Sequence, residues 1–171
     1  AASGSPQGHQ DVVNAAAALL ATAGHDPAFV AEALLLPGEA LIGDHMPSVD
    51  PEAIHAAREG LRRSLLSALR EPLWTAWHDC DAPSDQSPRA KGIRRLKGIL
   101  LSLLLADDDH EATAAAFLQF TGATGMTDRM SALTALSHSN AVERIEALKL
   151  FERRYDARPE VLDKWFLAQA T

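Results

Sequence analysis

Helix starts recur along this sequence and limit its fold more than any other feature. At each start a proline, usually after a short polar residue, precedes a run whose apolar residues recur every three or four positions. Asp and Ser side chains cap the first helical turn, and proline fits that turn because its missing N–H would be unpaired there. The starts are Asp26-Pro27, Asp50-Pro51, Ser87-Pro88 and Pro159. The pattern predicts a series of separate α-helices.

Composition favours the same fold class. Ala and Leu form about a third of the 171 residues, and aromatic residues only 5%. Ala and Leu favour helices, whereas the β-branched and aromatic residues that favour strands are scarce. The apolar fraction of 47% is ordinary for a globular chain. We therefore expect an all-α protein of one domain, or one domain and a piece of another.

The same signals predict the remaining elements. Residues 1–9 are expected to form a flexible lead-in, and residues 79–87 a polar loop. Residues 37–49 should form an irregular connection, packed down because it holds Leu41, Ile42, Met46 and Val49. In the first half of the chain, helices are expected over about 10–23, from 27 to the Pro37-Gly38 pair, from 51 to a bend or end at Pro72, and over 88–106. In the second half, one helix is expected from the Asp107–Asp109 run to about 120 and another over 128–136 after a Thr127 cap. The last two are expected from an Asn140/Glu143 capping box to about 156 and over 160–170.

Short joints between these helices imply that neighbours in sequence pack antiparallel. The helix after Asp50 should turn one apolar stripe inward, formed by Ile54, Ala57, Leu61, Leu65 and Leu69. The predicted architecture is an irregular α–α superhelical, solenoid-like array of about eight helices, because no strict internal repeat is present. We expect residues 10–171 to be one helical domain, truncated on its C-terminal side.

Charge, cysteine content and hydropathy exclude several classes of protein. A net charge of −7 lacks the basic footprint of a nucleic-acid binder. The single cysteine, Cys80, excludes an internal disulfide framework and multi-cysteine metal sites. No apolar run approaches the ~20 residues that span a bilayer, and the first residues do not resemble a signal peptide. We therefore expect neither nucleic acid nor membrane as a partner.

No complete metal or nucleophile motif is present. His110 and Glu111 begin a near match to the HExxH zinc motif, but Ala114 stands where the second histidine belongs. His110 is therefore expected to be an exposed residue at a helix start. The run His78, Asp79, Cys80, Asp81 is expected to form an ordinary loop, because adjacent residues do not share a helix face. Nothing nearby would activate Cys80 as a nucleophile.

Three other features have simpler structural interpretations. Gly122 to Gly125 is expected to be a helix end followed by a turn rather than a phosphate cradle. The basic pairs Arg62-Arg63 and Arg94-Arg95, with Lys97, are expected to form solvated or ion-paired helix faces rather than anion sites. Trp165-Phe166 should be a core or interface anchor. The chain thus offers no catalytic and no metal residues, and its substrate-binding residues are unknown.

Four stretches resemble the C-terminal helical domain of the bacterial aminopeptidase N family, the alanyl aminopeptidases of the zinc gluzincin class. They are LLLPGEALIGDHM (34–46), VDPEAIHAARE (49–59), MTDRMSALTAL (126–136) and LDKWFLAQAT (162–171). Their order and spacing match the family from about residue 11 to 171. The loop 79–87 and the joint 137–139 match poorly.

The resemblance implies a role in a larger enzyme. Such an enzyme removes N-terminal residues from peptides in a chamber that its helical domain caps and walls. Its zinc is held by HExxH and a distant Glu, and its substrate by a GxMEN loop, none of which occurs in this chain. Tyr155 does not match the catalytic tyrosine of the family. The implied partners are the remaining domains of its own chain and, through them, peptides. The resemblance implies zinc in the parent enzyme, whereas no cofactor is expected in this chain itself. It also implies a cytoplasmic location.

Two alternatives stay open at this point. The chain could be a free-standing helical scaffold that binds partner proteins, although its last helix carries apolar Val161, Leu162, Trp165 and Phe166 rather than the polar cap that a complete array needs. It could also be an enzyme with an unrecognised site around His78 and Cys80. The fragment alone is not expected to be an enzyme.

Overall fold

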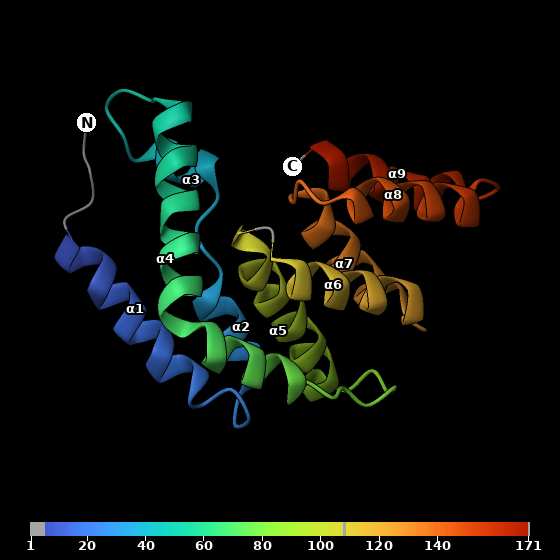
Figure 1. Cartoon of the computed structure of the whole chain (residues 1–171), viewed down its shortest axis with the longest axis horizontal. Helices are drawn as coiled ribbons and strands as arrows, with labels where there is room; N and C mark the ends of the chain where they lie inside the picture. The colour runs from blue at the N-terminus through green and yellow to red at the C-terminus, as the bar shows by residue number, and fades with distance from the viewer. Residues whose placement is uncertain (1–5, 108, 171) are drawn as a thin grey trace. The chain divides into compact units, whose positions relative to one another are not determined.

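The computed structural model describes residues 6–107 and 109–170. Within these ranges the chain forms nine α-helices and one 3-10 helix, and none of the described residues is in a strand. The predicted all-α class is confirmed. The chain divides into two compact units, one ending at Leu103 and the other beginning at Leu104. Figure 1 shows the helices in order along the chain.

The first unit contains α1 to α4 and nearly all of α5. The bounds are α1 Pro6–Leu20, α2 Pro27–Leu34, α3 Glu39–Asp44, α4 Pro51–His78 and α5 Pro88–Leu104. Helix α4 is the longest; α1 and α3 pack against it, and α2 packs against α1. Two predicted caps are confirmed: Asp26 accepts from the Phe29 N–H and Asp50 from the Ala53 N–H, both at 3.0 Å.

Proline bends α4, as the sequence predicted. The helix continues past Pro72 to His78, but Leu69 has non-helical angles of φ −124° and ψ 20°. A proline removes one helical hydrogen bond, and its ring crowds the carbonyl four residues earlier, so the distortion falls on the preceding turn. In the apolar stripe Ile54, Leu65 and Leu69 are buried as predicted, whereas Ala57 is exposed.

Three expectations about the first unit were wrong. Residues 6–9, expected in the flexible lead-in, are helical, while residues 1–5 lie outside the described residues. The connection 37–49 is not wholly irregular, because it contains α3. Its apolar side chains are not packed down either: Leu41, Met46 and Val49 are 54%, 38% and 56% exposed. The apolar composition of this connection therefore did not predict burial, because burial also requires a neighbouring element that covers these side chains.

The second unit contains the 3-10 helix Leu105–Asp107, α6 His110–Gly122, α7 Met126–Ser137, α8 Val142–Tyr155 and α9 Pro159–Ala170. Each of these α-helices packs on the next one, and α6 and α7 also pack on the helix after that, α8 and α9. Its core includes Phe120, Leu133, Leu136 and Phe151. This stacking, together with the order of helices in Figure 1, fits the predicted solenoid-like array.

The predicted caps of α7 and α8 were wrong. Gly125, not Thr127, occupies the N-cap position of α7, and Ala141, not Asn140, that of α8. Buried Ser139 shapes the joint before α8: its hydroxyl donates to the Leu136 carbonyl at 2.8 Å and accepts from the Ala141 N–H at 3.4 Å. The joint is therefore fixed by a residue that the helix-start signals did not identify.

Two further points concern the whole chain. No helix within the described residues has both the length and the apolar character needed to cross a bilayer. That residues 10–171 form one helical domain, truncated on its C-terminal side, stays a prediction.

Candidate functional site

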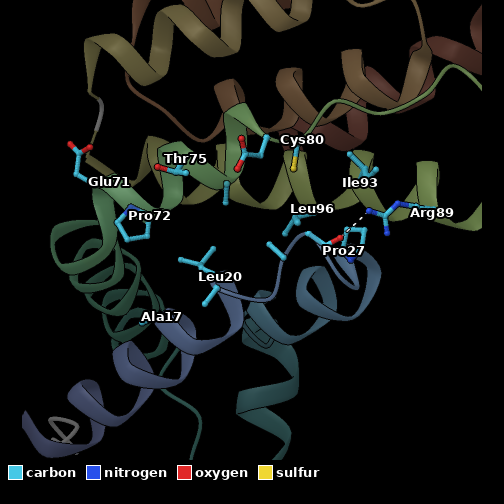
Figure 2. A pocket seen from close by; sticks show the side chains of 15 residues that line it. Ala17, Leu20, Pro27, Glu71, Pro72, Thr75, Cys80, Arg89, Ile93 and Leu96 are labelled. Carbon is cyan, nitrogen blue, oxygen red and sulfur yellow. Dashed lines mark hydrogen bonds between the residues drawn. The ribbon is translucent and has the colours of Figure 1, made fainter.

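One pocket in the first unit is the natural place to look for a site. It has a volume of about 590 Å³ and lies among α1, α4 and α5. Figure 2 shows Leu20, Pro27 and Leu96 on its walls, together with the Cys80 sulfur. Glu71, Thr75, Asp79 and Arg89 supply its other polar side chains. A mainly apolar pocket of this size falls in the range of ligand sites.

The polar groups of this pocket do not form a catalytic set. The Arg89 guanidinium donates to the Gly24 carbonyl at 2.9 Å and to the His25 carbonyl at 3.3 Å, so it fixes the joint between α1 and α2. Burial raises the pKa of the Cys80 thiol to about 11. A thiol nucleophile needs the opposite shift and a neighbouring base. The pocket wall therefore holds an inert cysteine.

The run His78 to Asp81 does not converge on one point. His78 ends α4 with its ring 5.6 Å from that of Trp74 and 5.1 Å from that of Trp77. Cys80 is buried, while Asp79 and Asp81 are exposed. The polar loop begins at Asp79, as predicted for residues 79–87, so of these four residues His78 alone belongs to the helix. The sequence analysis did not predict that the His78 ring would contact the Trp74 ring. The spacing allows this contact, because residues four apart lie on the same helix face.

His110 lies where the sequence places it, as the exposed first residue of α6. Asp109 caps this helix by accepting from the N–H groups of Glu111 and Ala112 at 2.8 and 3.1 Å. Ala114 is exposed one turn later. Over residues 6–107 and 109–170, no three His, Cys, Asp or Glu side chains gather into a group that could hold a metal. The residues present do not fit a zinc site.

The basic clusters are engaged within the fold. Arg62 donates to the Ser102 carbonyl at 2.6 Å and pairs with Glu59 at 2.9 Å. Arg95 pairs with Glu32 at 2.5 Å, and the Lys97 ammonium lies 5.0 Å from the centre of the Trp77 ring. These contacts join helices, which favours the interpretation as an ion-paired face over an anion site.

Arg94 has a structural role that the sequence did not reveal. This largely buried guanidinium donates to the Pro83 carbonyl at 2.8 Å and to the Asp85 carbonyl at 3.0 Å. It therefore holds the polar loop 79–87 against α5. A signal for this role would have been a basic residue within the first two turns of a helix that follows a loop.

The glycine pair and the aromatic pair also have structural roles. Helix α6 ends at Gly122 and Gly125 is the N-cap of α7, so the predicted turn is confirmed. The Arg129 guanidinium donates to the Ala123 carbonyl within this turn, so the turn does not resemble a phosphate cradle.

The Trp165 indole donates to the Leu148 carbonyl at 2.9 Å and anchors α9 on α8. Phe166 is 61% exposed.

Tyr155 likewise has a structural place. Its ring centre lies 4.6 Å from that of Phe151, and its hydroxyl accepts from the Arg129 guanidinium at 3.0 Å. None of the candidate residues thus forms a nucleophile, base or metal constellation with another.

Comparison with known proteins decides the family. The family described as "Domain of unknown function (DUF3458_C) ARM repeats" matches residues 2–171. This chain belongs to that family. ARM repeats are α-helical arrays, so the match confirms the predicted solenoid-like architecture.

Two curated relatives of this DUF3458_C chain are aminopeptidases N. The protein from Caulobacter vibrioides is 33% identical over 146 residues, and that from Escherichia coli is 31% identical over 148 residues. These matches cover 84% and 85% of this chain but only 17% of each relative. The resemblance to aminopeptidase N is confirmed, and the chain spans about a sixth of the length of the curated relatives it matches.

A solved structure supports the fold independently. The crystal structure of Legionella pneumophila aminopeptidase A in complex with aspartic acid superposes with a TM-score of 0.79 at 24% sequence identity. The match covers 90% of this chain and 19% of that one. At this identity the likeness establishes the helical fold alone.

Proposed function

We propose that this chain is part of the helical domain of a zinc-dependent aminopeptidase N, where it helps to wall the chamber in which peptides lose their N-terminal residues. The observation that supports the proposal most is the pair of aminopeptidase N relatives, matched over 84% and 85% of this chain. A free-standing scaffold is not favoured, because these relatives are several times longer than the matched region.

The proposed zinc is held by residues outside this chain. No cluster of metal-ligating side chains is found in the part of the chain that the structure describes, and His110 lacks a second histidine one turn away. When bound in the parent enzyme, zinc activates a water and polarises the peptide carbonyl. The contribution of this chain is the fixed position of its helices.

A chamber wall must keep its shape, and the contacts between the helices of the first unit supply that property. Arg62 joins α4 to α5, Arg95 joins α5 to α2, and Arg94 holds the 79–87 loop. A rigid enclosure excludes water and large folded substrates and keeps a bound peptide in register. We therefore propose that the chain controls which substrates enter the chamber and helps to position the bound peptide.

The test uses the full-length protein. We expect it to hydrolyse an alanyl p-nitroanilide and short peptides, to lose activity with a chelator and to regain it with zinc. Removal of residues 10–171 from the full-length protein should abolish activity or admit larger substrates, and removal of residues 1–5, which precede α1, serves as the control. Unchanged rates and unchanged size selectivity after removal of residues 10–171 would contradict the proposed wall.

We also propose a cytoplasmic location, which the resemblance to aminopeptidase N supports. Fractionation of the source cells, with an antibody raised to this chain, should recover it with cytoplasmic markers. Recovery with an extracytoplasmic or membrane fraction would contradict this location.

A further inference from the structure

The pocket among α1, α4 and α5 is a cavity that the proposed function does not use. Its lining is mainly apolar and includes Leu20, Ile93 and Leu96 together with alanine and proline side chains. Leu20 and Leu96 are only 8% and 1% exposed, so this lining belongs to the packed core of the first unit and keeps its position. A pocket of about 590 Å³ with such a lining has room for a small ligand with an apolar body.

One face of α4 supplies polar groups to this pocket. Glu71, Thr75 and Asp79 recur every four residues, so they lie on the same side of the helix. Figure 2 shows Glu71 and Thr75 at the left of the pocket and Arg89 at the right. The three α4 side chains are exposed, and none of them makes an ion pair or a side-chain hydrogen bond with a described residue. Two carboxylates and a hydroxyl are therefore available to a ligand.

The basic side chains near the pocket are instead held by the fold. The Arg89 guanidinium donates to the carbonyls of Gly24 and His25, which directs it toward the joint between α1 and α2. The Lys97 ammonium lies 5.0 Å from the centre of the Trp77 ring. The charge that remains free at the pocket is therefore negative, and it favours a cationic ligand.

The Asp79 carboxylate acts at the pocket wall itself. Figure 2 shows the Cys80 sulfur on this wall. Burial raises the pKa of the Cys80 thiol, the Lys97 ammonium lowers it, and the Asp79 carboxylate raises it again. Because the interaction between charges weakens with distance, this effect places the carboxylate close to the sulfur. A cation bound in the pocket would therefore meet Asp79.

From this chemistry we propose that the pocket binds an alkylammonium ion, a primary ammonium group on an apolar body. The apolar body lies against Leu20 and Leu96, and the ammonium group lies at the α4 edge near Thr75 and Asp79. The three N–H donors of such a group match hydroxyl and carboxylate acceptors. Burial of the apolar body supplies most of the affinity, because charge pairs exposed to water are individually weak. The carboxylates select the sign of the ligand charge. This site is separate from peptide hydrolysis and does not rest on the proposed function.

Photo-labelling of the full-length protein tests this inference with a local readout. The probe is octylamine with a diazirine in its chain, which is charged at neutral pH as a lysine side chain is. Linked residues are identified by mass spectrometry, and only links to the α1 and α5 walls of the pocket are counted. The alcohol and the carboxylic acid of the same length are the comparison probes. We expect the amine to label these walls about threefold more than the alcohol, and the acid to label them least.

Two variants separate charge from packing. Glu71→Gln combined with Asp79→Asn removes both carboxylates and should lower labelling by the amine to the level of the alcohol. The matched control is Glu146→Gln, because Glu146 on α8 is also exposed and without a partner among the described residues, and labelling should not change. Ala17→Leu places a larger side chain in the pocket lining and should reduce labelling by the amine and the alcohol alike.

Three outcomes overturn the inference. Equal labelling by the three probes, or labelling by the amine that persists without the two carboxylates, would show a cavity with no preference for a cation. Labelling that Ala17→Leu does not reduce would place the links outside the pocket. An absence of links to the pocket walls would show that the pocket does not bind an alkylammonium ion. The peptidase activity of the same preparation is measured separately, so a failure of the proposed function remains distinguishable.

Discussion

Arg129 shows how a single buried charge holds the second unit together. This side chain is 4% exposed, and its three nitrogens donate to the carbonyls of Phe120 and Ala123 and to the hydroxyl of Tyr155. The two carbonyls lie at the C-terminal end of α6, where unpaired carbonyls and the helix dipole favour a positive charge. Arg129 therefore joins α6, α7 and α8.

We predict that Arg129→Met lowers the free energy of unfolding by about 3 kcal/mol, because the buried Phe120 carbonyl and the half-buried Ala123 carbonyl lose a charged donor. The measurement is urea unfolding followed by circular dichroism. Arg158→Met is the control, because Arg158 is exposed, and it should change stability by less than about 0.5 kcal/mol. Equal effects of the two substitutions would show that Arg129 has no special structural role.

Cys80 should react slowly with alkylating reagents. Its pKa is raised from 9.0 to about 11 by burial, and only the thiolate reacts. At pH 8 the thiolate fraction is then about 100-fold lower than for a free cysteine. We predict that the rate of labelling by iodoacetamide lags behind that of a model thiol by at least this factor and continues to rise above pH 9. A rate equal to that of the model thiol at pH 8 would contradict this placement of Cys80.

The same shift predicts how pH acts on stability. The folded-state pKa of Cys80 lies above its unfolded value, so the folded state holds the proton more tightly. The stability that this provides is present below about pH 9 and is lost as the pH rises toward about 11. Removing the thiol in Cys80→Ala should reduce this alkaline loss in urea unfolding experiments. An unchanged alkaline profile would assign the loss to other groups.

The sequence predicted residues whose role is local and missed those whose role depends on distant contacts. The caps at Asp26 and Asp50 were predictable because each bonds an N–H three residues away. Arg129 was not, because Tyr155 is 26 residues away. Arg94 was missed for the same reason: the loop carbonyls that it binds are placed by the fold. For the candidate site, the sequence correctly left His78 to Asp81 as separate side chains.

At the scale of helices, one close approach limits how α2 and α5 can pack. A Cβ atom added at Gly92 would lie 2.9 Å from both the Cβ and the backbone nitrogen of Ala28. Real Cβ atoms do not approach backbone so closely, and the backbone of a helix cannot move away as a flexible side chain can. Glycine at position 92 therefore sets the distance between these two helices.

We predict that Gly92→Ala destabilises the chain by about 1–3 kcal/mol, although alanine is the better helix former. Gly60→Ala is the matched control, because Gly60 also lies in a helix and an added Cβ there meets nothing within 4 Å. It should stabilise the chain by about 0.5–1 kcal/mol. Thermal unfolding of both variants measures the difference, and shifts of the same sign would contradict the close packing.

Helix existence was easier to predict than helix ends. Proline-led starts at 27, 51, 88 and 159 were confirmed because proline and its capping neighbour act within one turn. The start of α7 differs from the prediction because Gly125, which has no side chain to cap the helix, takes the N-cap position two residues before Thr127. The short helix α3 was missed because its six residues have no cap side chain. Such an element depends on its packing against α4.

At the scale of the whole molecule, this helical chain exposes large apolar side chains, which suits the proposed position inside a larger protein. Val142, Ile145 and Phe166 lie exposed in the second unit, and Leu41 and Val49 in the first. Isolated exposed apolar residues are ordinary, but groups of them mark surfaces that another segment covers. Composition and periodicity could predict the fold class; only the resemblance of four stretches to a known family could predict the larger enzyme.

The mass of the native protein in its source cells tests the central claim most directly. An antibody raised to this chain, applied to a cell extract, gives that mass, and the aminopeptidase activity of the same chromatographic fraction is recorded. Because the first relative has about 860 residues (146/0.17), at 18.3 kDa per 171 residues we predict a band of about 92 kDa (860 × 18.3/171) that elutes with activity. A band near 18.3 kDa without activity would contradict the claim that this chain is the helical wall of an aminopeptidase.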